Sequence, residues 1–184
     1  KIGQDLEWNF DQGEAKFGKA SDFKVKPIDG KDPMVMSFPN SNPESDFNGL
    51  DVYHGGEPNG GSDWLVNQYT IIADLYYTVR SYNKIRALVA LNDFEGAQFL
   101  IGTSNGIGSS SFSGKLRPNG WYRVALTIDH VIGEINYYID GDFVGTEQIK
   151  QIQDDNGKYA MEDVFYLFKN TSDTFGGFIS SLQY

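Results

Sequence analysis

The chain has 184 residues, which is the size of one domain and enough to bury a hydrophobic core. Its formal charge of −10 argues against nucleic-acid binding, because an acidic surface repels phosphate backbones. It contains no cysteine for a disulfide or a thiolate metal site, and no run of apolar residues long enough to span a membrane.

The sequence begins at Lys1, which suggests a processed protein or a domain excised from a larger one. No repeat, linker or low-complexity tract divides it, so we expect residues 1–184 to form a single domain. Acidic surfaces are common among extracellular bacterial proteins, and we expect an extracellular or cell-surface location, whereas the absence of cysteine fits a secreted and a cytosolic protein equally.

Short stretches of alternating residues separated by turn residues predict about a dozen strands and almost no helix. In chain order these stretches are 6–10, 23–26, 33–38, 49–53, 68–79, 85–91, 97–102, 121–129, 133–140, a short strand after 141, 164–168 and 177–184. Many short strands with turns between them predict an all-β fold, a jelly-roll sandwich of two antiparallel sheets.

The clearest strands form a hairpin from Trp121 to Gly145. The dipeptide Asp140-Gly141 predicts a tight turn, because both central positions of such a turn need positive φ. Arg123, Thr127 and Asp129 lie on the side that faces water or a ligand. The alternate side chains are predicted to lie in the core: Tyr122, Val124, Leu126, Ile128, Ile135, Tyr137 and Ile139.

The hairpin sequence W-Y-R-V-A, then D, then G-x-I-x-Y-Y-I-D-G-x-x-V-G resembles laminin-G-like domains of the concanavalin A-like lectin–glucanase superfamily. Residues 6–10, 66–76 and 177–184 fit the same pattern, and in those domains the first and last strands lie close together. The resemblance implies a jelly roll that binds sugars and, in many members, a calcium ion.

Two catalytic classes share that jelly roll, and the sequence lacks the key residues of both. Retaining β-glucanases place two acids about 5 Å apart on one strand in a Glu-x-Asp-x-x-Glu-like pattern. The nearest approach here, residues 44–49, lacks the second glutamate. Alginate-lyase-like enzymes need Gln-x-His, which does not occur, since the two histidines are His54 and His130. We therefore expect no catalytic residue.

Polar groups and aromatic rings share the water-facing side of the predicted sheet, which suits sugars because hydroxyls need hydrogen bonds and sugar faces need rings. This side comprises Asp74, Tyr76, Arg86, Asn92, Arg123, Asp129, Asn136 and Tyr138. The glycine-rich loop 53–64 adds a rim. The predicted ligand contacts are Arg86, Arg123, Asp129 and Tyr138 on the sheet, with His54 and Trp64 on the rim. The same pattern also fits an ordinary solvated face with cross-strand ion pairs.

Calcium is the one metal that the resemblance implies. Oxygen ligands are abundant, and we place a candidate site in loops near the chain ends, at Asp11, Asp22 and Asn170. Transition metals are not expected in a chain without cysteine and with two histidines.

Three functions are open at this stage. The first is a non-catalytic carbohydrate-binding module of a larger extracellular protein, whose partners are a polysaccharide or glycan and the neighbouring domains of its own chain. The second is an architectural or protein-interaction domain without sugar binding. The third is a polysaccharide lyase or glycosidase with an atypical site.

Overall fold

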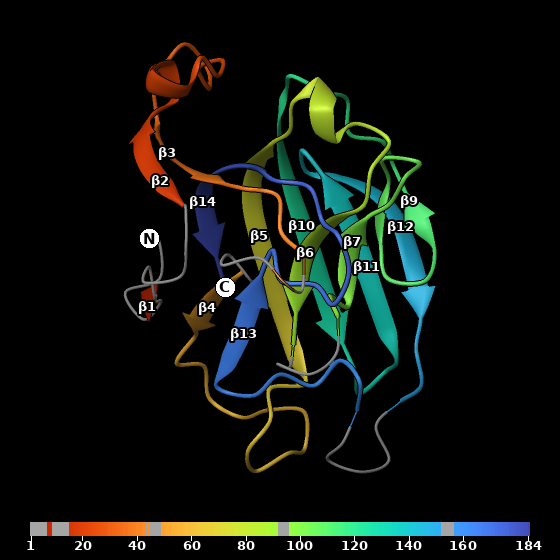
Figure 1. The fold of residues 1–184 in the computed structure, drawn as a ribbon. Helices are drawn as coiled ribbons and strands as arrows, with labels where there is room; N and C mark the ends of the chain where they lie inside the picture. The colour runs from red at the N-terminus through yellow and green to blue at the C-terminus, as the bar shows by residue number, and fades with distance from the viewer. Residues whose placement is uncertain (1–6, 9–14, 43, 45–48, 92–95, 152–156) are drawn as a thin grey trace.

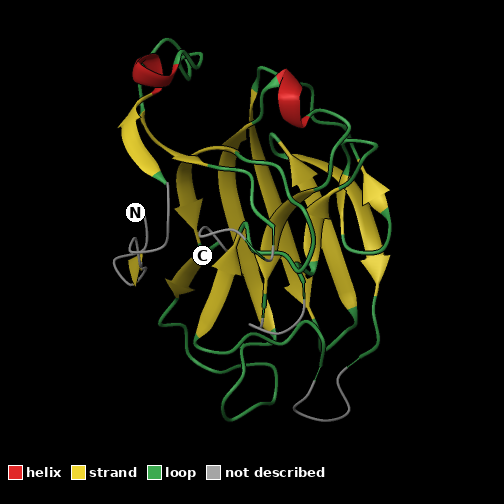
Figure 2. Ribbon diagram, viewed as in Figure 1, coloured by secondary structure: helices red, strands yellow, loops and turns green. Residues whose placement is uncertain are grey.

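The computed structural model describes residues 7–8, 15–42, 44, 49–91, 96–151 and 157–184. These residues form two antiparallel sheets that lie face to face, with only two short 3-10 helices, both at the same end of the sandwich (Figures 1 and 2). No helix in these segments has the length and hydropathy needed to cross a bilayer.

The first sheet, sheet A, has seven strands in the order β1-β4-β13-β6-β7-β8-β9. Its strands are β1 (Glu7–Trp8), β4 (Leu50–Tyr53), β13 (Val164–Leu167), β6 (Arg86–Ala90), β7 (Phe99–Ile101), β8 (Ile107–Gly108) and β9 (Phe112–Ser113). Most are short, and the buried ones are rich in apolar residues.

The second sheet, sheet B, has seven strands in the order β12-β11-β10-β5-β14-β3-β2. They are β12 (Asp142–Gln148), β11 (Glu134–Ile139), β10 (Trp121–Asp129), β5 (Gln68–Tyr76), β14 (Gly177–Gln183), β3 (Met34–Phe38) and β2 (Lys16–Lys19). Strands distant in sequence are therefore neighbours in both sheets, and the predicted all-β jelly roll is confirmed.

The core lies between the two sheets and contains the predicted hairpin residues. Val124, Leu126, Ile128, Ile135, Tyr137 and Ile139 are all buried, as predicted. Tyr122 is half-buried, because its hydroxyl accepts a hydrogen bond from the exposed backbone N–H of Arg117 (3.2 Å). The register of the hairpin thus follows from its alternation.

The predicted tight turn also forms, with φ of 53° at Asp140 and 89° at Gly141. These angles match the turn that two-residue hairpins prefer. The strand after it is longer than expected and runs to Gln148, with an irregularity opposite Tyr137 and Tyr138 that shifts the register by one residue.

The predicted strand 23–26 is wrong. The chain there forms the 3-10 helix η1 (Ala20–Phe23), and Lys24 then adopts a left-handed conformation. Asp22 fixes the start of this helix by accepting a hydrogen bond from the backbone N–H of Lys19 (2.8 Å). The predicted strand 68–79 likewise ends early, at Tyr76, because Val79–Ser81 forms the 3-10 helix η2.

Residues 16–34, which we call the arm, cover one end of the outer face of sheet B. Figure 1 shows the arm at the upper left, where β2, η1 and β3 project beyond the sandwich. The indole N–H of Trp121 donates to the carbonyl of Lys26 (2.7 Å). A second apolar cluster packs beneath the arm, made of Ala20, Val25, Val35 and Tyr76 with Phe23, Trp121 and Phe178. The rest of this outer face is open.

The first and last strands do not pair with each other. The first, β1, pairs with β4 in sheet A, whereas β14 lies between β3 and β5 in sheet B. The last residue nevertheless crosses the gap, since the ring of Tyr184 lies 4.7 Å from that of His54, the residue after β4. Burial raises the pKa of Tyr184 to about 12, so its hydroxyl stays protonated there.

Candidate functional site

The open part of the outer face of sheet B is built by β14, β5, β10, β11 and β12. Antiparallel register aligns outward side chains in rows across these strands. Starting from the arm, the rows are Ser181, Asp74 and Arg123; then Gln183, Ile72, Ala125, Tyr138 and Phe143; then Thr70, Thr127, Asn136 and Thr146; then Gln68, Asp129, Glu134 and Gln148. We call this four-row surface the open face.

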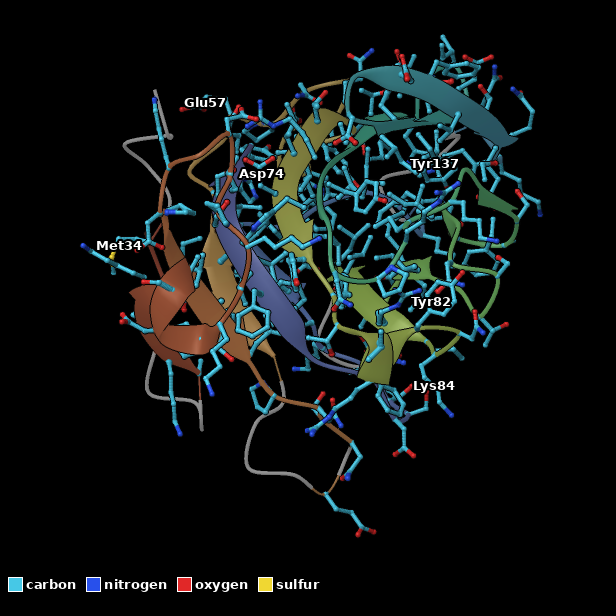
Figure 3. The ribbon with its side chains drawn as sticks, turned by 90° about the horizontal axis from the view of Figure 1, so that it is seen from above. Met34, Glu57, Asp74, Tyr82, Lys84 and Tyr137 are labelled. Atoms are coloured by element: carbon cyan, nitrogen blue, oxygen red, sulfur yellow. The ribbon has the colours of Figure 1, made fainter. Side chains whose placement is uncertain are left out.

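Arg123 and Asp74 form a two-pronged ion pair in the first row. Nε of Arg123 donates to Oδ1 of Asp74 and Nη2 donates to Oδ2, both at 2.7 Å. The hydroxyl of Ser181 donates to the same Oδ2 (2.7 Å). Asp74, labelled in Figure 3, is 13% exposed, whereas the side chain of Arg123 is 55% exposed. The guanidinium is therefore held rigidly with its free edge toward solvent.

The ion pair is charged at neutral pH. Burial alone would raise the pKa of Asp74, but hydrogen bonds from Arg123 and Ser181 outweigh it and lower that pKa. The hydrogen bond to Asp74 raises the pKa of Arg123 in turn. A second carboxylate lies close by, since the backbone N–H of Arg123 donates to Oδ1 of Asp140 (2.8 Å).

An aromatic pair occupies the next row. The rings of Tyr138 and Phe143 meet edge to face with their centroids 5.7 Å apart, and Phe143 is 59% exposed. The small side chain of Ala125 separates Tyr138 from Ile72 in this row. Arg123 is a diagonal neighbour of Tyr138, about 7–8 Å away for such pairs. The exposed ring of Phe143 on β12 and the exposed guanidinium of Arg123 on β10 thus lie on either side of β11, which contributes Tyr138.

Asp129 lies on the open face, as predicted, and its carboxylate shapes the end of the sheet. Oδ1 accepts hydrogen bonds from the backbone N–H groups of Val131 (3.1 Å) and Ile132 (3.2 Å). Oδ2 accepts from the side chain of Gln68 (2.9 Å). These bonds give Asp129 a structural role in the turn between β10 and β11.

The prediction that Arg86 faces water is wrong. It is 1% exposed on β6 of sheet A, a strand buried along its whole length. Nη2 donates to Oδ1 of Asn105 (2.8 Å), and the guanidinium lies 5.0 Å above the ring of Tyr77. Alternation showed the strand but not that the strand is buried on both faces. Asn92, predicted beside it, lies outside the described residues.

The prediction that His54 is an exposed rim contact is also wrong, because its side chain is buried. Nδ1 accepts a hydrogen bond from the backbone N–H of Gly56 (2.9 Å), and Nε2 contacts the carbonyl of Glu162. His54 therefore connects the loop after β4 to the backbone just before β13. Trp64, 52% exposed on the connection from β4 to β5, stays available to a ligand but does not belong to the four rows.

Two of the three residues predicted to bind calcium, Asp22 and Asn170, already have hydrogen-bond partners. Asp22 is occupied at the start of η1, and Asn170 accepts from the backbone N–H of Ala97 (3.2 Å) and donates to the hydroxyl of Ser172 (3.0 Å). Asp11 lies outside the described residues. Nowhere in the described segments do three or more His, Cys, Asp or Glu side chains gather to hold a metal. Calcium binding stays a prediction.

Sequence reasoning missed Phe143, the most exposed ring on the open face. Its signal was the Asp140-Gly141 turn, which places the residues after the turn opposite those before it. The turn itself sets Phe143 against Tyr138, and the register irregularity that follows decides which later residues of β12 face outward. Nothing in the sequence indicated the role of Ser181, because it contacts Asp74 only through the pairing of β14 with β5.

Comparison with known proteins supports the fold. No known family model matches the sequence, and no curated protein sequence matches it. Among solved structures, a heptameric SAP-like pentraxin from Limulus polyphemus shares 15% identity and a TM-score of 0.54 over 82% of this chain and 75% of the other. An alginate lyase of polysaccharide lyase family 7 shares 15% identity and a TM-score of 0.51 over 97% and 92%.

Botulinum neurotoxin type C is a third neighbour, with 15% identity and a TM-score of 0.52. The match covers 97% of this chain but 42% of the toxin chain. Identity this low shows a shared fold and nothing further. The chain is therefore a jelly roll of the concanavalin A-like kind.

Proposed function

We propose that this domain is a non-catalytic carbohydrate-binding module of an extracellular protein, and that the open face of sheet B binds the glycan. The observation that carries the proposal is the exposed guanidinium of Arg123 on β10, held by Asp74, on the same open face as the exposed ring of Phe143 on β12. We include in the proposal laminin-G-like membership within this fold and association with neighbouring domains of the parent chain.

The chemistry of these two groups matches a sugar. A ring packs against the apolar face of a pyranose, while a fixed guanidinium donates hydrogen bonds to hydroxyls. An open sheet surface also accepts a polymer that extends beyond the contact. Each hydrogen bond replaces one to water and nets about 1 kcal/mol. A few such bonds and one ring contact give a dissociation constant of about tens of micromolar to millimolar.

The carboxylates of the open face support binding rather than glycoside cleavage. A glycosidase needs one carboxylic acid with a raised pKa. The pKa of Asp74 is lowered instead, and its oxygens are held by Arg123 and Ser181. Asp129 holds a turn, and Glu134 accepts a hydrogen bond from Gln148 (3.1 Å).

Two of the structural neighbours are named for sugar ligands. The toxin is described as entering cells through interaction with two ganglioside molecules, and the lyase is named for alginate. These names describe those proteins. A glycan ligand for this chain is consistent with what these neighbours of the same fold are named for. An extracellular location is consistent with such a ligand.

Binding to a panel of immobilised polysaccharides tests the proposal. Retention on at least one polysaccharide is expected, and Phe143→Ala should weaken it about tenfold through loss of the ring contact. Phe112→Ala is the matched control, because Phe112 is an exposed ring on β9 of the other sheet. Trp64→Ala tests the rim in parallel.

Three results would contradict the proposal. Retention of the parent on no polysaccharide would favour an architectural domain. Unchanged binding of Phe143→Ala together with loss in Trp64→Ala would move the site to the loop. New reducing ends or unsaturated sugar ends after incubation with a polysaccharide would identify an enzyme.

A further inference from the structure

The charge and geometry of the open face also limit the class of glycan it can bind, and this inference rests on the proposed function. We propose that the glycan is an uncharged polysaccharide, and that the outer edge of the Arg123 guanidinium binds two adjacent hydroxyls of one sugar ring. Asp74 is then a positioning residue, because it acts on the sugar through Arg123.

The geometry of the ion pair leaves one edge of the guanidinium free. Arginine carries five N–H donors in a planar fork. Asp74 occupies the edge formed by Nε and Nη2. Nη1 and the second hydrogen of Nη2 point away from Asp74, and no described residue accepts a hydrogen bond from either. Two parallel donors fixed in one plane match the two oxygens of adjacent hydroxyls.

The charge around this edge disfavours an anionic sugar. Asp74 already neutralises Arg123, and the carboxylate of Asp140 accepts the backbone N–H of Arg123. The last row adds Asp129 and Glu134 without a cation in any of the four rows other than Arg123. Asp129 and its strand partner Glu134 lie six residues from Arg123 along β10, about 20 Å away. The guanidinium therefore has two carboxylates beside it, those of Asp74 and Asp140, in a chain of net charge −10. A uronate or sulfate would meet repulsion that a hydroxyl does not.

The lysines of the arm are the nearest alternative source of positive charge. Lys24, Lys26 and Lys31 are exposed, and no described residue forms an ion pair with them. The arm, however, lies over Tyr76 and Trp121, the row before the open face. Figure 3 shows Met34, at the end of the arm, standing apart from Asp74. These lysines therefore flank the open face and do not line it.

The aromatic row gives the sugar its second contact. Phe143 is exposed, and the ring of Tyr138, its neighbour in the same row, contacts it edge to face. Tyr138 on β11 lies between Phe143 on β12 and Arg123 on β10, so a sugar chain that contacts both groups extends over Tyr138. Stacking on the apolar face of a sugar does not depend on charge, so this contact adds affinity without requiring an acidic group on the sugar.

The test compares two panels by isothermal titration calorimetry on the whole chain: uncharged polysaccharide fragments, and uronate or sulfated fragments. Binding to at least one uncharged fragment is expected. Its affinity should change by less than about twofold when sodium chloride rises from about 0.1 M to about 1 M, because no net charge is paired. An anionic ligand should lose about tenfold or more over that range.

Two substitutions separate geometry from charge. Arg123→Lys keeps the positive charge but removes the planar fork. Arg123→Gln removes the charge. Recognition of adjacent hydroxyls predicts that both weaken binding about tenfold, whereas an anion held by charge would tolerate lysine. Phe112→Ala again serves as the control that should bind like the parent.

The outcomes distinguish this inference from the proposed function. Binding to uncharged fragments with little salt dependence supports both. Binding to acidic fragments alone, with strong salt dependence and with Arg123→Lys active, overturns the inference and leaves a glycan-binding module. Binding to no fragment of either panel overturns the proposed function, and this inference with it.

Discussion

Arg86 and Arg123 have similar neighbours in the sequence, but Arg86 is buried and Arg123 is exposed. Each sits on an apolar strand, and alternation alone assigns both to a water-facing side. Arg123 lies on β10, whose outer face is open, so its exposure was predictable. Arg86 lies on β6, which is buried along its length. Periodicity identifies the two faces of a strand, but what covers each face depends on contacts between distant segments.

Arg86→Ala should therefore destabilise the fold by about 3 kcal/mol, because it removes a buried guanidinium that holds Asn105 and packs on Tyr77. Arg123→Ala should cost less, about 1 kcal/mol, since the guanidinium is 55% exposed and Asp74 keeps its hydrogen bond from Ser181. Urea denaturation followed by tryptophan fluorescence measures both. Equal stability of the two variants would contradict the structural role assigned to Arg86.

At the scale of elements, the hairpin from Trp121 to Gln148 was predictable and the arm was not. The hairpin can be predicted from its own residues, because alternation and an Asp-Gly turn are local sequence patterns. The helix η1 exists because Ala20 and Val25 bury themselves against Tyr76, which is distant in sequence. On the open face, Asp74, Arg123 and Tyr138 were found from alternation, and the two-residue turn places Phe143 opposite Tyr138. The pairing of Ser181 with Asp74 was not predictable, because it depends on the order of distant strands.

Glu147 on β12 links the two sheets along one edge and makes the fold sensitive to acid. Its side chain is nearly buried, and it accepts hydrogen bonds from the hydroxyl of Tyr137 (2.6 Å; Figure 3) and from the backbone N–H groups of Ser109 (3.2 Å) and Ser110 (2.7 Å). Burial alone would raise the pKa of Glu147, but these hydrogen bonds, with that of the Ser110 hydroxyl, outweigh it and lower the pKa.

A lowered pKa in the folded state means that the stabilisation by Glu147 is fully present above the unfolded value of 4.5 and is lost as the pH falls below it. Glu147→Gln should cost about 2 kcal/mol at neutral pH. Its stability should also fall less steeply than that of the parent below pH 4.5. Denaturant melts of both proteins at stepped pH values measure this. Parallel curves would show that the carboxylate makes no such contribution.

At the scale of the molecule, the fold class followed from the sequence and the location of the site followed only in part. A dozen short strands with turns between them define a sandwich without any knowledge of their order. How much of the outer face of sheet B stays open depends on where the arm packs, and the cluster beneath the arm draws on four separate segments of the chain. The arm covers one end of sheet B, and the rest of that face is available to a ligand.

The central claim is that a glycan lies on the open face of sheet B, and nuclear magnetic resonance tests it most directly. Titration of a retained oligosaccharide into nitrogen-15-labelled protein reports which backbone amides sense the ligand. The account predicts the largest shifts at Arg123, Ala125, Tyr138 and Phe143, with small shifts on sheet A. Shifts confined to the loop around Trp64, or to the strands of sheet A, would contradict it.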